Sequence, residues 1–241
     1  VALIFAIPGQ TLDEWQADLS LALALQTEHI SAYALTYEPG TAMAARLARG
    51  EFPKADEDIE ADMFEATLAR LRQAGLDRYE VSNFSKPGAE CQHNLGYWRQ
   101  EAWLAAGPAA SGHVGGARWK NIPRLDDYLD HHDAGFAPVM DVEMPDPRRA
   151  LVERLMTGLR LREGVDAQPV VEGAEGLNPG AGKRLLARVA KLRSQGLLET
   201  GNALAEGGGT IAATGERWSL TDRGFLVADG IVRGLVGVLG F

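Results

Sequence analysis

The feature that most constrains the fold is a pair of short apolar runs in which hydrophobic and polar residues do not alternate. They are VALIFAI at residues 1–7 and HISAYALT at residues 29–36, and both are typical of strands buried on both faces of a parallel sheet. Amphipathic patterns predict helices at residues 12–26 and 56–75, and DRYEVSN at residues 77–83 predicts a third strand. Strands and helices therefore alternate, which indicates an α/β chain built from βαβ units with right-handed crossovers.

The carboxyl ends of these predicted strands define an edge where we expect a ligand. Parallel sheets and barrels bind their ligands at that edge. Thr36 and Asn83 lie there, and the segment ECQHNLGYW at residues 90–98 follows the third strand directly. The small residues of GPAASG, at 107–112, would also allow a close approach of backbone to ligand.

A change of composition at residues 145–147 predicts a boundary between two domains, at residues 1–145 and 146–241. The second domain opens with a predicted helix and continues with GKRLLARVAKLRSQGLLET and ERWSLTDRGFLVADGIV. These stretches indicate a helix, a short strand, a loop, a short strand and a helix, which is typical of an α+β winged-helix domain. The glycines at 207–209 are predicted to form the tip of the wing.

Composition and charge argue against several classes of protein. The content of 46% hydrophobic and 24% charged residues is that of ordinary globular domains, and the net charge of −9 disfavours bulk attraction to nucleic acid or to anionic membranes. A role in DNA binding stays open only for a basic face on the predicted recognition helix, although such a face is more often simply solvated. Its residues are Lys183, Arg184, Arg188, Lys191 and Arg193.

Several features of the whole chain bear on its location and extent. No apolar run approaches the ~20 residues of a membrane-spanning helix. The single cysteine cannot form an internal disulfide and no secretory leader is visible, so a cytoplasmic location is predicted. Because the chain begins without methionine and inside a strand pattern, we expect it to be the later part of a longer protein. The strand at residues 1–7 should then lack a neighbour on one side.

The segment at residues 90–98 concentrates groups that could perform chemistry. Cys91 and His93 are two possible metal donors, but a structural zinc needs four ligands and a catalytic zinc three. As a nucleophile, Cys91 would need an activating base and an oxyanion hole, which its neighbour His93 does not by itself supply. Two interpretations stay open: a ligand-facing loop, or a loop in which polar side chains bond the backbone while Tyr97 and Trp98 cover the end of the sheet.

In order along the chain, LIFAIPGQT, HISAYALTYEPGT, YEVSNFSKPGAECQHNLGYW, LAAGPAAS and LRLREGVD resemble the oxygen-independent coproporphyrinogen III oxidase-like family of radical S-adenosylmethionine (SAM) proteins. The HNxxYW element is similar to that of its HemW-type heme chaperone branch. The resemblance covers nearly the whole chain and implies the C-terminal part of a partial (βα)6 TIM-type barrel followed by a winged-helix-like domain. It also implies SAM and a 4Fe-4S cluster as cofactors, heme or a porphyrinogen as ligand, and a role in heme metabolism.

The family holds its cluster on a CxxxCxxC motif, whereas this chain has only Cys91. The resemblance therefore implies that the cluster ligands lie in a missing N-terminal half and that this chain alone is inactive as a radical enzyme. We assign no catalytic residue and no ligand of the cluster to it. The partners that the resemblance implies are the missing half, the tetrapyrrole and recipient apoproteins.

Matching the family's motifs residue by residue identifies three positions of this chain that correspond to SAM contacts in the family, which we call SAM-side positions. Ala2 stands where the family has an aspartate, and Thr36 stands at a strand exit whose backbone meets SAM. Ser111 occupies a position where the chaperone branch usually has histidine, and His113 follows two residues later. At Ala2 and Ser111 the chain departs from the family's pattern.

For the tetrapyrrole, the resemblance favours the HNxxYW element. His93 offers an axial nitrogen, and the candidate contacts for heme beside it are Asn94, Tyr97 and Trp98. Two alternatives belong to other classes of function: a noncatalytic module that binds and delivers heme, and a winged-helix regulator that binds DNA.

Overall fold

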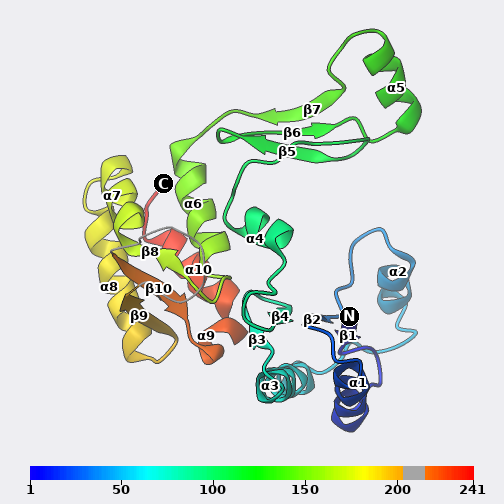
Figure 1. Cartoon of the computed structure of the whole chain (residues 1–241). Helices are drawn as coiled ribbons and strands as arrows, with labels where there is room; N and C mark the ends of the chain where they lie inside the picture. The colour runs from blue at the N-terminus through cyan, green and yellow to red at the C-terminus, as the bar shows by residue number, and fades with distance from the viewer. Residues whose placement is uncertain (203–214) are drawn as a thin grey trace. The chain divides into compact units, whose positions relative to one another are not determined.

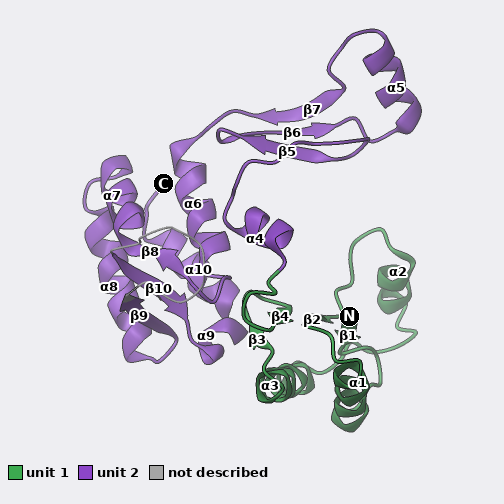
Figure 2. Ribbon diagram, viewed as in Figure 1, with its two compact units in different colours: residues 1–90, 206–209 green, residues 91–205, 210–241 purple. Residues whose placement is uncertain are grey.

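The computed structural model describes residues 1–202 and 215–241, which form two compact units (Figure 1, Figure 2). Unit 1 consists of residues 1–90, and unit 2 consists of the described residues from 91 onward. The wing tip predicted at 207–209 lies outside the described residues. None of the helices described is both long enough and apolar enough to span a bilayer.

Unit 1 contains a four-stranded sheet in the order β1-β2-β4-β3. Its strands are β1 (Ala2–Phe5), β2 (His29–Ala34), β3 (Asp77–Arg78) and β4 (Asn83–Ser85). β1 and β2 are parallel, with Ala2 opposite Ser31, as the two unalternating apolar runs predict. Among the described residues β1 pairs with β2 alone, so it is an edge strand, as predicted for residues 1–7.

The prediction of one continuous strand at residues 77–83 is wrong. β3 and β4 are separate short strands that pair in antiparallel fashion, and β4 also runs antiparallel to β2. Between them Glu80 is 1% exposed, and its carboxylate accepts hydrogen bonds from the Ser82 backbone N–H (3.2 Å) and the Asn83 side-chain amide. Because a buried carboxylate requires such donors, the chain turns back around Glu80 instead of continuing as a strand.

Two helices cover one face of this sheet. α1 (Leu12–Ala24) begins with a capping box formed by Thr11 and Glu14, and α3 (Glu57–Gln73) begins at Asp56, whose carboxylate caps its first turn. Their apolar sides pack together and against the sheet. The core that results is made of buried side chains that include Phe5, Trp15, Leu19, Ile30, Met63, Leu71 and Phe84.

The opposite face of the sheet is exposed at β1 and at the end of β2 among the described residues. Side chains alternate across a strand, so Ile4 and Tyr33 project on the face opposite to the buried Phe5 and Ile30. Ile4 is 54% exposed and Tyr33 is 43% exposed. A short helix, α2 (Ala42–Ala48), follows the exit loop of β2.

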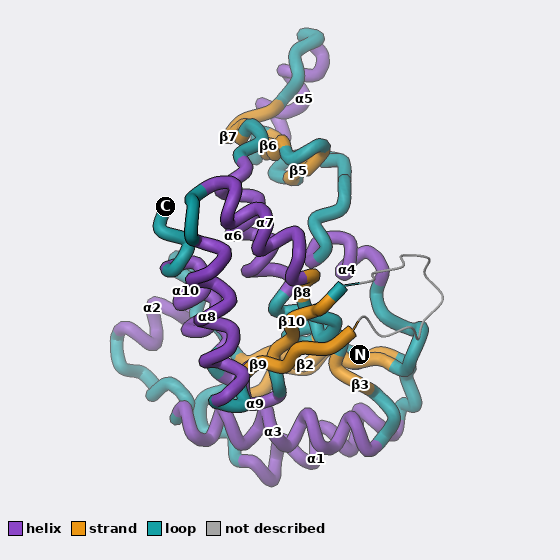
Figure 3. The backbone as a smooth tube through the Cα atoms, turned by 90° about the vertical axis from the view of Figure 1, so that its left-hand side faces the viewer, coloured by secondary structure: helices purple, strands orange, loops and turns teal. Residues whose placement is uncertain are grey.

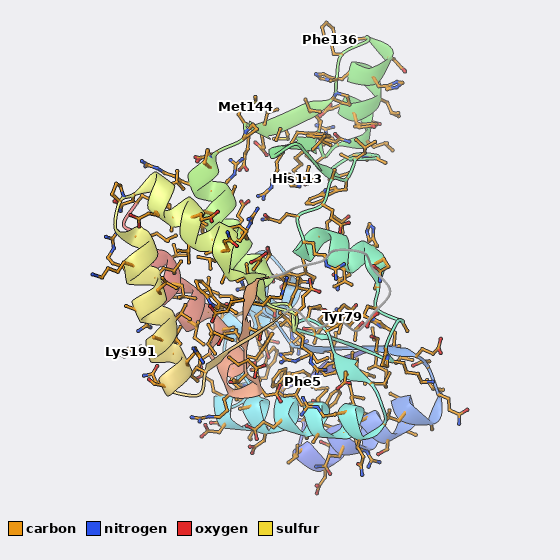
Figure 4. The ribbon with its side chains drawn as sticks, turned by 60° about the vertical axis from the view of Figure 1, so that its left-hand side comes forward. Phe5, Tyr79, His113, Phe136, Met144 and Lys191 are labelled. Carbon is orange, nitrogen blue, oxygen red and sulfur yellow. The ribbon has the colours of Figure 1, made fainter. Side chains whose placement is uncertain are left out.

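Unit 2 begins with α4 (Gln92–Trp98) and continues into a projecting arm. The arm consists of β5 (Ser111–Val114), β6 (Ala117–Asn121), α5 (Leu125–Asp133) and β7 (Val139–Glu143). Its strands form an antiparallel sheet in the order β5-β6-β7. Gly112 leaves room for Trp119, because a Cβ at Gly112 would lie 2.2 Å from the Trp119 ring. Phe136 and Met144 on the arm are 68% and 69% exposed, so the arm presents apolar side chains to water (Figure 4).

The rest of unit 2 has the element order of a winged helix, as predicted. The elements are α6 (Pro147–Gly158), β8 (Val165–Asp166), α7 (Ala167–Leu177), α8 (Ala181–Ser194), β9 (Leu198–Asn202), β10 (Glu216–Leu220), α9 (Asp222–Leu226) and α10 (Ala228–Gly237). Helices α6, α7, α8 and α10 pack together beside an antiparallel sheet in the order β8-β10-β9 (Figure 3). Its core includes Leu155, Leu185, Trp218 and Leu235, all fully buried.

Candidate functional site

The segment that carries the HNxxYW element is a helix, so the prediction of a loop at residues 90–98 is wrong. Cys91 adopts an extended conformation as the N-cap of α4, and its carbonyl accepts the Leu95 N–H at 2.9 Å. Leu95 is buried and anchors the helix. His93 and Tyr97 are four residues apart, and the helix therefore brings them to one face.

His93 and Tyr97 begin a continuous row of four rings, which we call the aromatic row. The ring centroids are 4.7 Å apart between His93 and Tyr97, and 4.8 Å apart between Tyr97 and Trp103. A third contact, also 4.8 Å, joins Trp103 to His113 on β5. The first two contacts are edge-to-face, the arrangement that the charge distribution of aromatic rings favours. The row thus connects α4 to the first strand of the arm.

A pocket of about 130 Å³ lies beside the aromatic row. Its walls are Gln92, His93, Gly96, Tyr97, Glu101, Ala102 and Trp103. The Glu101 carboxylate lies against Gly96, where a Cβ would be 3.3 Å from one of its oxygens. Pockets that enclose drug-sized ligands measure ~300–1,000 Å³. This pocket can therefore receive only an edge or a substituent of a large ring, and the rest of such a ring would lie over the exposed His93 and Tyr97.

The other two residues of the predicted ligand site lie on the neighbouring stripe of α4. Asn94 and Trp98, again four residues apart, are both half-buried. Trp103 also belongs to the row, which its place in the sequence did not predict. A tryptophan shortly after the HNxxYW element was the signal available, but only the pairing of its segment with β5 shows that it reaches Tyr97.

The donors in the described residues suit heme iron and do not suit an iron–sulfur cluster. No group of three or more His, Cys, Asp or Glu side chains in that part of the chain is placed to hold a metal ion. Cys91 is exposed and is the single cysteine of the sequence, whereas a 4Fe-4S cluster requires several thiolates. Axial ligation of heme requires one imidazole beside flat apolar surface, and His93 with the row fits that requirement.

The three predicted SAM-side residues fall in both units. Ala2 pairs with Ser31 at the start of β2, whereas Thr36 follows the end of that strand, roughly 16 Å further along at ~3.3 Å per residue. Ala2 and Thr36 are therefore at opposite ends of the parallel pair. Ser111, the first residue of β5, belongs to unit 2. A SAM contact at any of these positions stays a prediction.

Two buried polar atoms follow the exits of β1 and β2. Gln10 Oε1 comes after the turn at Pro8 and Gly9, and the Tyr37 hydroxyl comes directly after Thr36. Neither atom has a hydrogen-bond partner among the described residues. Buried polar groups ordinarily have one, so these two atoms fit a polar ligand at the exit edge of the parallel strands.

A polar cluster occupies the sheet of unit 1 near its antiparallel pairings. Ser31 donates a hydrogen bond to the Asn83 side-chain oxygen, and Asn83 donates to Glu80. On the same strand as Ser31, His29 Nε2 lies 2.9 Å from the Tyr79 hydroxyl. Burial is the largest cause that lowers the pKa of His29 below its ordinary value; the positive amino terminus adds to this effect, and Glu80 opposes it.

The lowered pKa of His29 predicts a pH dependence of stability. Below about pH 6.5 the unfolded chain takes up a proton on this imidazole more readily than the folded chain does, so the free energy of unfolding should decrease as the pH falls. Urea unfolding between pH 8 and pH 5 measures the decrease, and His29→Gln should reduce it. The exposed His132 is the matched control, and equal pH profiles for wild type and His29→Gln would contradict the assignment.

The basic face of α8 is partly used within unit 2. Arg184 Nε donates to the Val238 carbonyl at 2.9 Å, after the end of α10. Arg188 lies against Gly234 of α10, where a Cβ would be 2.8 Å from its guanidinium. Lys183, Lys191 and Arg193 are exposed. Two of the five basic residues are therefore engaged with α10, which weakens the interpretation of α8 as a DNA recognition helix.

Comparison with known sequences gives consistent relatives, although no protein-family model matches the chain. It is 36% identical over 235 residues to the heme chaperone HemW of Mycobacterium tuberculosis, covering 98% of this chain and 54% of that protein. It is 34% identical over 188 residues to the heme chaperone HemW of Bacillus subtilis, covering 76% and 49%. It is also 37% identical over 112 residues to the mitochondrial radical S-adenosyl methionine domain-containing protein 1 of Danio rerio, covering 46% and 25%. The chain thus spans about half the length of the curated relatives it matches.

Among solved structures, the chain is similar to coproporphyrinogen III oxidase (HemN) from Escherichia coli, which is described as a radical SAM enzyme. The TM-score is 0.67 at 18% identity, over 99% of this chain and 54% of that one. At this identity the likeness shows the fold alone, and it confirms the predicted fold class. The sheet of unit 1 is open in the described residues, and no closed barrel is formed.

Proposed function

This chain belongs to the HemW-type family of heme chaperones within the radical SAM coproporphyrinogen oxidase-like proteins, and we propose that it binds heme at the aromatic row. One observation carries the proposal: the exposed imidazole of His93 stands at the end of a row of rings and beside a pocket. A heme site needs an axial nitrogen and flat apolar surface, and the row offers both.

Each member of the site has a distinct part in the proposed binding. His93 would ligate the iron, because its ring is exposed and is oriented by the edge-to-face contact with Tyr97. Tyr97 and Trp103 would contact the macrocycle through their apolar rings. The pocket is too small to enclose a porphyrin and would receive one edge of it. Asn94 and Trp98, on the next stripe of α4, are proposed as flanking contacts.

For the whole protein we propose a radical SAM scaffold of heme metabolism, with this chain as its tetrapyrrole-binding part. SAM would lie at the exit edge of β1 and β2, near Thr36 and the unpartnered atoms of Gln10 and Tyr37. Ala2 and Ser111 are SAM-side candidates by resemblance to the family alone: Ala2 lies at the opposite end of the parallel pair from Thr36, and neither residue is assigned to the exit-edge site. SAM bound to a 4Fe-4S cluster supplies radical chemistry, but this chain has too few cysteines to hold the cluster, so we assign no chemical step to it.

The proposed role of the protein is to hold heme and pass it to recipient apoproteins. We propose that residues 1–145 contribute the barrel part and residues 146–241 the winged-helix-like domain. A single free cysteine suits a reducing compartment such as the cytoplasm, which is where we place the protein.

Titration of the 241-residue chain with hemin tests the proposal. The wild-type chain should give a saturable shift of the Soret band, and His93→Ala should weaken the affinity by at least about tenfold, because the iron loses its protein ligand. His132→Ala is the matched control, since His132 is an exposed imidazole on α5. If His93→Ala and wild type give the same Soret titration, His93 is not the ligand. If the wild-type chain gives no saturable shift, the heme site is not in this chain.

A further inference from the structure

The end of the aromatic row that lies away from α4 is held by hydrogen bonds to backbone. The Trp103 indole N–H donates to the Ser111 carbonyl at 2.9 Å. His113 Nδ1 lies 3.1 Å from the Glu101 carbonyl. In addition, the backbones of Trp103 and His113 form an antiparallel bridge with N···O distances of 2.8 and 2.9 Å. Both rings are therefore held by hydrogen bonds to neighbouring backbone.

The bond to Glu101 determines the tautomer of His113. A carbonyl oxygen can only accept a hydrogen bond, so Nδ1 must carry the hydrogen, and in the neutral ring Nε2 keeps its lone pair. His113 is 9% exposed, and no other side-chain hydrogen bond of this residue exists among the described residues. The one polar interaction of the buried imidazole is thus with the segment that precedes β5.

That segment, residues 101–103, is one wall of the pocket. It belongs to no helix or strand, and the bridge to His113 is its link to the sheet of the arm. Side chains alternate across β5, so the Trp119 ring lies on the side of Gly112, and His113 projects on the opposite side, where it contacts Trp103. The imidazole is consequently placed between the strand and the pocket wall.

We propose that His113 is a positioning residue of the tetrapyrrole site, and the inference rests on the heme binding proposed above. Its Nδ1–H holds the Glu101 carbonyl, and this bond fixes the segment at residues 101–103 so that the Trp103 ring continues the flat apolar surface from Tyr97. His113 itself does not ligate iron in this arrangement. Its contribution to affinity comes from the prior ordering of the wall, which lowers the entropy lost when a rigid ring binds.

Three variants separate the positioning role from a ligand role. His113→Asn places an amide N–H near the Nδ1 position, His113→Gln places its amide near the Nε2 position, and His113→Ala removes both. We expect His113→Ala and His113→Gln to weaken hemin affinity about tenfold, and His113→Asn to stay within about threefold of wild type. If His113→Gln kept the hemin affinity of wild type and His113→Asn did not, the proposal would be overturned in favour of a role for Nε2. Equal affinity of all three variants and wild type would overturn it as well.

A second readout on the chain without heme keeps this inference separate from the heme proposal. Near-ultraviolet circular dichroism reports the fixed environment of Trp103 once the Trp103→Phe spectrum is subtracted, and amide hydrogen exchange reports the bridge between Trp103 and His113. Both signals should be lost in His113→Ala and retained in His113→Asn, with far-ultraviolet spectra unchanged. If hemin does not bind to wild type, the heme proposal fails, and this readout still decides whether His113 orders the wall. An unchanged Trp103 signal in His113→Ala would refute the positioning role.

Discussion

Replacing Trp15 with alanine is expected to destabilise unit 1 by about 3–5 kcal/mol, the cost typical of removing a fully buried tryptophan. Trp15 is 0% exposed, and its ring lies 5.3 Å from that of Phe5 between α1 and the sheet. Its indole N–H also donates to the Thr67 hydroxyl at 2.9 Å and approaches the Met63 carbonyl at 3.2 Å. The substitution would leave both a cavity and a poorer set of hydrogen bonds where α1 packs on α3.

Trp15→Phe is the matched control for this substitution. It keeps most of the apolar ring next to Phe5 and removes the indole donor, so it should cost only about 1–2 kcal/mol. Urea unfolding gives the overall change, and amide hydrogen exchange in α1 and α3 assigns it to unit 1, since two units need not unfold together. If both variants unfolded at the same urea concentration, the buried ring volume would not be what stabilises this core.

Replacing Gly164 with alanine is expected to destabilise the winged-helix part of unit 2 by about 4 kcal/mol or more. Gly164 has φ +70°, a conformation that costs an alanine about 1 kcal/mol. In addition, a Cβ there would lie 2.1 Å from the Trp218 carbonyl oxygen of β10. The clash is with backbone, so it can be relieved only if β10 or the turn before β8 moves. Substitutions that strain the backbone at such positions are among those that lower the free energy of unfolding by several kcal/mol. Chemical unfolding of the variant measures the change.

Gly176→Ala is the control for the glycine substitution. Gly176 lies in α7, and a Cβ at that position meets nothing within 4 Å. Alanine is the better helix former, so this change should be neutral or stabilise unit 2 by up to about 1 kcal/mol. Indistinguishable unfolding midpoints for the two alanine variants would show that the approach of Gly164 to β10 does not constrain this domain.

The parts of the fold that the sequence predicted correctly depend on local patterns. The unalternating runs identified β1 and β2 and their parallel pairing, although Ile4 and Tyr33 show that one face of this pair is exposed among the described residues. Thr11 and Asp56 marked the starts of α1 and α3, because capping is decided within four residues. The order of elements in the winged helix followed in the same way from periodicity and turn residues.

The errors arose where a distant or buried partner overrides the local pattern. Residues 77–83 have the composition of a strand. The buried Glu80 carboxylate, however, accepts hydrogen bonds from the Ser82 N–H and the Asn83 side chain, and the chain reverses direction between β3 and β4. Residues 90–98 lack a strong helical pattern and contain a glycine. They form α4 nevertheless, anchored by the buried Leu95. Neither outcome can be derived from spacing along the chain.

By itself, the sequence determined the alternation of strands and helices in the first part of the chain and the order of elements in the winged helix. The spacing of four residues brings His93 and Tyr97 together only because residues 92–98 form a helix, which the sequence did not predict. Only the tertiary structure decided that the row continues through Trp103 to His113. The physical reason is range: capping and periodicity act over a few residues, whereas the rings of residues 97, 103 and 113 meet only because an irregular segment pairs with β5. In the candidate site, His93 and Tyr97 are therefore brought together within one helix, whereas Trp103 and His113 are brought to them by pairing between distant segments.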